Sequence, residues 1–212
     1  MKRAANSAGD ALWKLYGQPR RAYSMGGVSA PSSRRLWDIV KKDLIEPHDA
    51  KHITDIWMEF HADPLKHRVA TVIPVEQYKV IAQNAARSPM FILPIFKGPN
   101  AFETILVQQQ LPVTLFTSLE EYKRAGAAAV PYLVATHYTE VSDKGIVLVR
   151  GDITNPNGIT PFEAGTLLRL AAEFYSIPKK HVFVERFNHA PNEFNFKNML
   201  DAMQHDTSNL QQ

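Results

Sequence analysis

Two histidines, His48 and His52, stand four residues apart, a spacing that could bind a metal ion from one face of a helix. The acid between them, Asp49, is shorter than the glutamate that zinc peptidases use as a base. Asp49 also has the position of a helix N-cap, which leaves His48 ahead of the helix. We therefore predict a solvated helix start, with no metal ligand and no cofactor.

Other familiar catalytic patterns are absent. The sequence has no cysteine, which excludes disulfides, thiolate metal sites and cysteine nucleophiles. It also has no glycine-rich phosphate-binding pattern and no G-x-S-x-G serine elbow. We assign no catalytic residue. A site assembled from distant residues, such as His137 and Asp152, remains the alternative hypothesis, and it would make the protein a small organelle enzyme.

The segment around Trp57 and His61 carries the next candidate side chains. Trp57 falls on the apolar stripe of a predicted helix, which favours a place in the core. His61 ends that helix, where a histidine can interact favourably with the helix dipole, which favours a structural role. Contact with a partner protein is the alternative role for both residues.

Hydrophobic spacing and turn residues predict the elements that position these side chains. Helices are expected over 36–46, from Asp49 to the Asp63-Pro64 stop, over 75–85, from Ser118, from Thr160 (capped with Glu163) and from Pro191. Strands are expected over 69–73, 90–96, 102–109, 111–116, 132–139, 145–150 and 181–187. Pro94 marks the second strand as an edge strand or a bulge. Because the strands come in runs, we predict a single α+β domain with a mixed, largely antiparallel sheet flanked by helices.

The N-terminal tail differs from the rest of the chain in charge. Residues 1–35 hold seven basic residues against one acidic residue, a net charge of +6, whereas residues 36–212 carry −3. Basic, serine-rich and nearly acid-free composition is typical of an organelle transit peptide. We predict a mitochondrial transit peptide over 1–23, cleaved between Tyr23 and Ser24, and a flexible linker over 24–35. The expected compartment is the mitochondrial matrix, with a plastid as the alternative.

The remaining composition limits the partners. Residues 36–212 carry excess negative charge, so we do not expect the protein to bind nucleic acid. The alternative hypothesis, a nucleic-acid-binding protein, predicts steeply salt-dependent binding. No run of about 20 apolar residues predicts a membrane span, so the protein is not expected to be integral to the membrane. The sequence carries no oligomerisation signal. Residues 205–212 are polar and are expected to form a frayed tail.

Several segments together resemble the mitochondrial ATP synthase assembly factor 1 family, the assembly chaperones of the catalytic beta subunit. They are Ile56–His61, Val72–Pro74, Lys144–Leu148 and, most specifically, Glu185–Phe194 with its pattern Phe-Asn-x-x-Pro-Asn-Glu-Phe. Their order and spacing fit the family over residues 36–204, which we predict to be the assembly-chaperone domain. The resemblance implies a non-catalytic chaperone that binds the unassembled beta subunit, prevents its aggregation and hands it on for assembly with the alpha subunit.

The last of these segments also suggests where a partner would bind. Pro191 is expected to begin the final helix, with Asn188 as its cap. A rigid strand-to-helix corner and a partner-binding corner are compatible interpretations. The residues that we predict to contact the partner are Phe187, Asn188, Asn192, Glu193, Phe194, Trp57 and His61.

Overall fold

The computed structural model describes residues 35–98 and 101–208. The predicted transit peptide, its cleavage site at Tyr23 and Ser24, and nearly all of the predicted linker lie outside the described residues. So do residues 209–212 at the other end, whereas the first four residues of the predicted tail continue the last helix.

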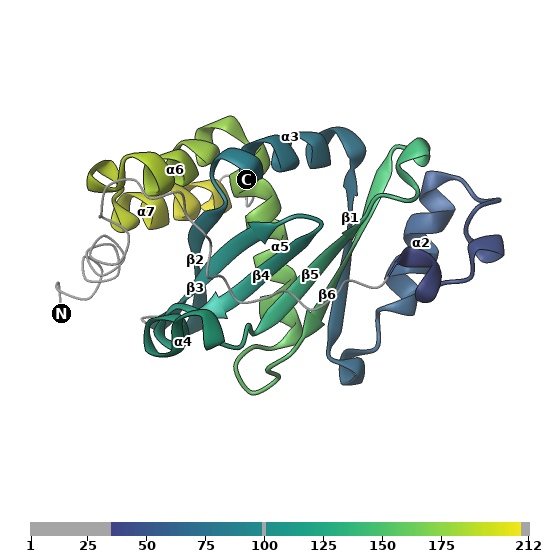
Figure 1. The fold of residues 1–212 in the computed structure, drawn as a ribbon, viewed down its shortest axis with the longest axis horizontal. Coiled ribbons are helices and arrows are strands. Elements are labelled where there is room, and N and C mark those ends of the chain that lie inside the picture. Colours follow the sequence, from purple (N-terminus) through teal and green to yellow (C-terminus); the bar gives the residue numbers. More distant parts are fainter. Residues whose placement is uncertain (1–34, 99–100, 209–212) are drawn as a thin grey trace.

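The described residues contain one six-stranded sheet, in which every pair of neighbouring strands is antiparallel (Figure 1). Its order is β1-β6-β5-β4-β3-β2. The strands are β1 (Arg68–Pro74), β2 (Met90–Gly98), β3 (Ala101–Gln110), β4 (Val113–Ser118), β5 (Leu133–Tyr138) and β6 (Ile146–Ile153). The α+β prediction is confirmed. Pro94 lies in β2, the edge strand, where its missing N–H leaves no ladder bond unmade.

Helices cover both faces of the sheet. They are α2 (Ala50–Phe60), α3 (Val75–Arg87), α4 (Leu119–Ala125), α5 (Pro161–Ser176), α6 (Pro178–His189) and α7 (Phe196–Ser208). We call the side on which α5 packs the α5 face; there Leu167 and Ala171 join the core of Val147 and Val149 (Figure 1). On the opposite side, the α2 face, α2 packs against Leu148.

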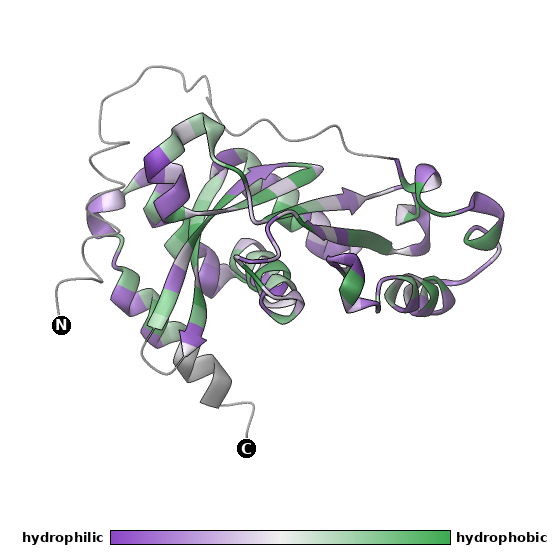
Figure 2. Cartoon of the chain, turned by 90° about the horizontal axis from the view of Figure 1, so that it is seen from below, coloured by the Kyte–Doolittle hydropathy of each residue, from purple (hydrophilic) through white to green (hydrophobic). Residues whose placement is uncertain are grey.

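Alternation along the strands explains this two-sided burial. Neighbouring residues of a strand point to opposite faces, so a strand covered on both sides is apolar throughout. The six residues of β4 are all buried, and in Figure 2 hydrophobic residues run through the strands and along α5. The α5 face therefore carries the largest hydrophobic cluster, and the α2 face carries two smaller ones, one under α2 and one beside α4.

Local capping explains where the principal helices begin. The Asp49 carboxylate accepts the backbone N–H of His52 at 2.8 Å, as predicted for the start of α2. Thr160 and Glu163 form the predicted capping box at the start of α5, where the Thr160 hydroxyl accepts the Glu163 N–H and the Glu163 carboxylate accepts the Thr160 N–H. The first turns of these helices are thus fixed by short-range hydrogen bonds.

Two predicted elements are wrong. The helix expected over 36–46 is replaced by two short 3₁₀ turns, Leu36–Asp38 and Lys42–Leu44, because Leu36 and Ile45 insert into the cluster beneath α2 while Leu44 stays exposed. The strand expected over 181–187 is part of α6. The buried residues His181 and Val184 are three residues apart, which is a helical spacing, and Pro178 starts the helix.

Among the helices formed by the described residues, none combines the length and the apolar character needed to cross a membrane.

Candidate partner-binding site

The C-terminal corner consists of the end of α6, the 3₁₀ turn η6 (Pro191–Glu193) and the start of α7. It joins two helices rather than a strand and a helix. Asn188 lies within α6, so the prediction that it caps the final helix is wrong. Its side-chain amide donates to the carbonyl oxygens of Met90 at 2.6 Å and Val184 at 2.8 Å, and its oxygen accepts the Met90 N–H at 3.3 Å.

This amide completes the edge of the sheet. Met90 is the first residue of the edge strand β2, and its outward N–H and C=O have no neighbouring strand. The Asn188 side chain bonds both groups as a backbone peptide of a further strand would. Unpaired strand edges invite unwanted pairing, so the asparagine has a structural reason for its position.

Aromatic rings hold the corner together. Phe187 and Phe194 stand edge to face with ring centroids 5.3 Å apart, and both lie about 6 Å from the buried ring of Phe91. Both are partly buried against the α5-face core. The partner contact predicted for these two rings is thus limited to the fraction of each that remains exposed.

Asn192 and Glu193 are exposed, as are their neighbours His189 and Asn195. Asn192 and Glu193 project from the 3₁₀ turn, and no described interaction ties their side chains to the core. Ser88, just ahead of β2, links the end of α6 to α5: its hydroxyl bonds His189 Nε2 at 2.9 Å, and its carbonyl oxygen accepts the Tyr175 hydroxyl at 2.8 Å. Burial raises the Tyr175 pKa. The corner is thus a packed support that presents polar side chains, Asn192 and Glu193 among them, to solvent.

The other predicted contact residues lie at the end of α2. Trp57 is fully buried, and its indole N–H donates to the Val149 carbonyl at 3.2 Å. The core interpretation of Trp57 is confirmed. His61 is 4% exposed, its ring lies tilted against the Trp57 ring with centroids 4.2 Å apart, and its Nδ1 bonds the Trp57 carbonyl at 2.7 Å. Neither side chain is on the surface.

His61 is uncharged at neutral pH. Burial, helped by the nearby cations Arg68 and Arg150, lowers the His61 pKa to about 4. A neutral ring whose Nδ1 meets a carbonyl oxygen must carry its hydrogen there, so His61 caps α2 as a neutral donor. The predicted structural role at the helix end is thus met by a neutral hydrogen-bond donor and not by a positive charge.

Three aromatic side chains that sequence reasoning did not single out are exposed at one end of the sheet. Phe96 ends β2, Phe102 begins β3 with its ring 6.3 Å away, and Phe162 in the first turn of α5 is 83% exposed. Lys97 connects these elements by an ion pair with Glu163 at 2.8 Å. We call Phe96, Phe102 and Phe162 the aromatic end. No periodicity in the sequence marks them, because exposure here depends on where the neighbouring helices stop.

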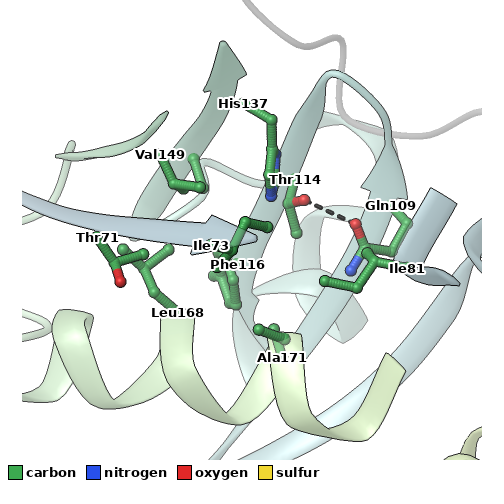
Figure 3. A pocket seen from close by; sticks show the side chains of 12 residues that line it. Thr71, Ile73, Ile81, Gln109, Thr114, Phe116, His137, Val149, Leu168 and Ala171 are labelled. Atoms are coloured by element: carbon green, nitrogen blue, oxygen red, sulfur yellow. Dashed lines mark hydrogen bonds between the residues drawn. The ribbon is translucent and has the colours of Figure 1, made fainter. Parts of the chain in front are cut away.

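The pocket most relevant to the enzyme alternative is a small cavity of about 20 Å³ between the sheet and α5 (Figure 3). Figure 3 shows His137 above it, Leu168 and Ala171 below it, and the Thr114 hydroxyl bonded to Gln109. Burial lowers the His137 pKa to about 4. The space suits about one water molecule.

His137 and Asp152 do not meet. His137 lines the cavity on the α5 face, whereas Asp152 points to the α2 face, where it pairs with Arg150. His48 and His52 stack 5.3 Å apart on the exposed start of α2. Within residues 35–98 and 101–208 there is no group of three histidine or acidic side chains arranged to hold a metal ion.

The fold and the corner agree with a comparison of the chain with known families. Residues 18–200 match the model of the ATP11 protein family, a stretch that includes the sheet and the entire corner. The chain belongs to this family. The match starts earlier than residue 36, from which we traced the resemblance.

Individual relatives carry informative names. The chain is 28% identical over 176 residues to the human protein named ATP synthase mitochondrial F1 complex assembly factor 1, covering 81% of this chain and 52% of the relative. It is 30% identical over 166 residues to the zebrafish protein of the same name, covering 76% and 53%. It is also 29% identical over 114 residues to the protein named Protein atp11, mitochondrial, of Schizosaccharomyces pombe, covering 51% of this chain and 40% of the relative. The chain spans about half the length of the first two relatives.

Proposed function

We propose that this protein is a mitochondrial assembly chaperone that binds the unassembled beta subunit of the F-type ATP synthase and releases it to the alpha subunit. The observation that carries the proposal is the family match over residues 18–200, together with relatives named as F1 assembly factors.

The physical task of such a chaperone follows from the state of its partner. A subunit that has not yet met its neighbour exposes an obligate, apolar interface and tends to aggregate. A protein that covers this surface lowers the free concentration of aggregation-prone subunit by mass action. It must bind more weakly than the alpha subunit, because tighter binding would block the exchange.

The structure offers a surface suited to this task. The aromatic end exposes three phenylalanines, the kind of side chain that anchors interfaces. Phe102 continues toward the C-terminal corner through a ring contact with Phe196 at 5.6 Å. We propose that the beta subunit contacts the aromatic end and the exposed Asn192 and Glu193. Phe187, Asn188 and Phe194 support this surface from behind.

The decisive experiment uses purified chain and isolated beta subunit. The chaperone should suppress light scattering of the beta subunit on warming and should co-elute with it in size-exclusion chromatography. The double variant Phe96→Ser/Phe162→Ser should lose most of this activity, while Leu44→Ser, which changes an exposed side chain in the second 3₁₀ turn, should keep it. A folded wild-type chain that neither binds nor protects a competent beta subunit would refute the proposal.

The compartment requires a separate test. We propose import into the mitochondrial matrix directed by residues 1–23, with cleavage between Tyr23 and Ser24. Radiolabelled chain incubated with energised mitochondria should become protease-protected, and the N-terminal sequence of the imported product should begin at Ser24. Uptake by isolated chloroplasts but not by mitochondria would favour the plastid alternative.

A further inference from the structure

The α2 face of the sheet changes character along its strands. Under α2 it is apolar, with Val72, Leu148 and Tyr138 in one hydrophobic cluster. Beyond the C-terminal end of α2 the same two strands, β1 and β6, present Arg68, Arg150 and Asp152 on that face. Arg68 lies directly across from Asp152, and Arg150 lies across from Ala70. We call Arg68, Arg150 and Asp152 the arginine row.

The arginine row has one more cation than anion. Arg150 donates to Asp152 from both Nε and Nη2, and both bonds end on the same carboxylate oxygen, Oδ1. Arg68 donates to the carbonyl oxygen of Phe60 at 2.9 Å, and its buried Nε has no acceptor among the described atoms. The nearby His61 is neutral, and the carboxylate of Asp63 is engaged by Lys66 at 3.5 Å. One positive charge is therefore not balanced locally.

Apolar side chains border the arginine row. The Arg68 guanidinium lies 4.6 Å over the ring of Phe60, which is 42% exposed, and Leu65 in the adjoining turn is 84% exposed. Arginine and aromatic side chains are both enriched at protein interfaces. The location is distinct from the aromatic end, since it lies on β1 and β6 at the opposite edge of the sheet (Figure 1).

From this juxtaposition we propose that the arginine row is a second docking point of the chaperone, which binds an aspartate or glutamate side chain from an extended segment of its protein partner. The carboxylate would be held by the guanidinium groups of Arg68 and Arg150, and apolar residues next to it would contact Phe60 and Leu65. The proposal rests on the proposed function only in taking the beta subunit as that partner.

Charge and shape favour this occupant over others. A single surplus positive charge matches a monovalent carboxylate better than a phosphate dianion. Planar guanidinium groups bind carboxylates by paired, charge-assisted hydrogen bonds. The apolar border fits a protein segment, and the net charge of −3 over residues 36–212 opposes the approach of a nucleic acid.

The test measures the affinity of isolated beta subunit for the full chain at several salt concentrations. Arg150→Gln should weaken binding roughly tenfold and reduce its salt dependence. Asp152→Asn should have the opposite effect, about threefold tighter binding, because it removes the internal competitor for Arg150. The matched control is Arg169→Gln, which breaks an ion pair with Glu173 on α5 and should change affinity less than about twofold.

The opposite effects expected of Arg150→Gln and Asp152→Asn on affinity distinguish a docking role of the arginine row from a purely structural one. If Asp152→Asn weakens binding as much as Arg150→Gln does, the row is a structural ion pair and the proposal falls. Equal affinity of folded Arg150→Gln and wild type also overturns it, while leaving the proposed function intact. Displacement of the beta subunit by inorganic phosphate but not by acetate would identify phosphate as the occupant and reject the carboxylate. A wild-type chain that does not bind at all refutes both proposals.

Discussion

The end of α2 and the C-terminal corner carry the most recognisable segments of this sequence, but their structures differ. At the corner, a half-buried asparagine and three aromatic rings close the edge of the sheet, and none of these side chains titrates. At the end of α2, a buried histidine lies beside charged strand residues that are only partly buried. A distinctive sequence segment can thus mark either a sheet edge whose polar groups are all bonded within the fold or one that keeps partly exposed charged side chains.

The difference lies in what the neighbouring backbone requires. Met90 needs a donor and an acceptor at fixed positions, and a single side-chain amide supplies both. Phe60 needs only a donor for its carbonyl oxygen, and Arg68 satisfies it with one of its five N–H groups. The Asn188 amide at the corner is therefore fully engaged within the fold. Arg68 in the arginine row has further N–H groups with which, under our proposal, it can bind a partner.

The largest effect is expected from the corner's central ring. Phe91 is fully buried against Phe174, Phe187 and Phe194. Phe91→Ala should lower the free energy of unfolding by about 3–5 kcal/mol, because it removes a core ring and leaves a cavity. Urea denaturation measures this loss. The control Phe162→Ala should change stability by less than about 0.5 kcal/mol, and a loss below about 1.5 kcal/mol at Phe91 would show that the corner is not a core element.

The second prediction concerns pH and sharpens the contrast, because the corner rings do not titrate. The pKa of His61 is lowered from 6.5 to about 4, so the unfolded chain binds the extra proton first as pH falls. The stabilisation is complete above pH 6.5, declines as pH drops toward 4, and is absent below. From pH 7 to 4.5 the loss should be about 2–3 kcal/mol.

This loss must be separated from that of other groups. His137 has the same shift, and the lowered pKa values of Glu163 and Glu173 also reduce stability as pH falls. The variant His61→Asn keeps an amide that can donate to the Trp57 carbonyl but does not titrate. Urea denaturation at pH 7 and at pH 4.5 measures the free energy of unfolding of the variant and of wild type. Between these pH values the variant should lose about 2–3 kcal/mol less than wild type. Identical declines would mean that His61 is charged in the folded protein.

The third prediction concerns the hydrogen bonds that Asn188 makes at the corner. Asn188→Ala removes three bonds and leaves the outward groups of Met90 without partners, so stability should fall by about 2 kcal/mol. Hydrogen exchange at the Met90 amide should accelerate together with this loss. Asn192→Ala, four residues on and exposed, is the matched control and should be nearly neutral. If the Met90 amide stays protected in Asn188→Ala, another group closes the edge.

Local signals in the sequence predicted much of the fold. Asp49 and the Thr160–Glu163 pair fixed two helix starts, and Pro94 marked the edge strand, because each acts over a few residues. The segment 181–187 misled because its valines suit a strand, while its buried positions follow a helical period that only tertiary packing reveals.

The candidate partner-binding site was less predictable than the fold, because its side chains depend on contacts between residues far apart in the sequence. The role of Asn188 depends on Met90, 98 residues away in the chain, and the charge of His61 depends on burial that no spacing encodes. Exposure at Phe96, Phe102 and Phe162 results from where helices end in space. Predictions made from the sequence therefore selected mostly buried or half-buried side chains, apart from Asn192 and Glu193, and missed the exposed rings of the aromatic end.

The smallest effect is expected at the open edge. Arg68→Lys retains the positive charge but loses the planar group over Phe60 and the geometry of its bond to the Phe60 carbonyl. Since this contact is partly solvated, stability should fall by at most about 1 kcal/mol in thermal or urea unfolding. Arg124→Lys, which alters an exposed pair with Glu121, provides the matched reference. A loss above about 2 kcal/mol at Arg68 would mean that this edge is as fully committed to the fold as the corner, and the contrast between the two regions would fail.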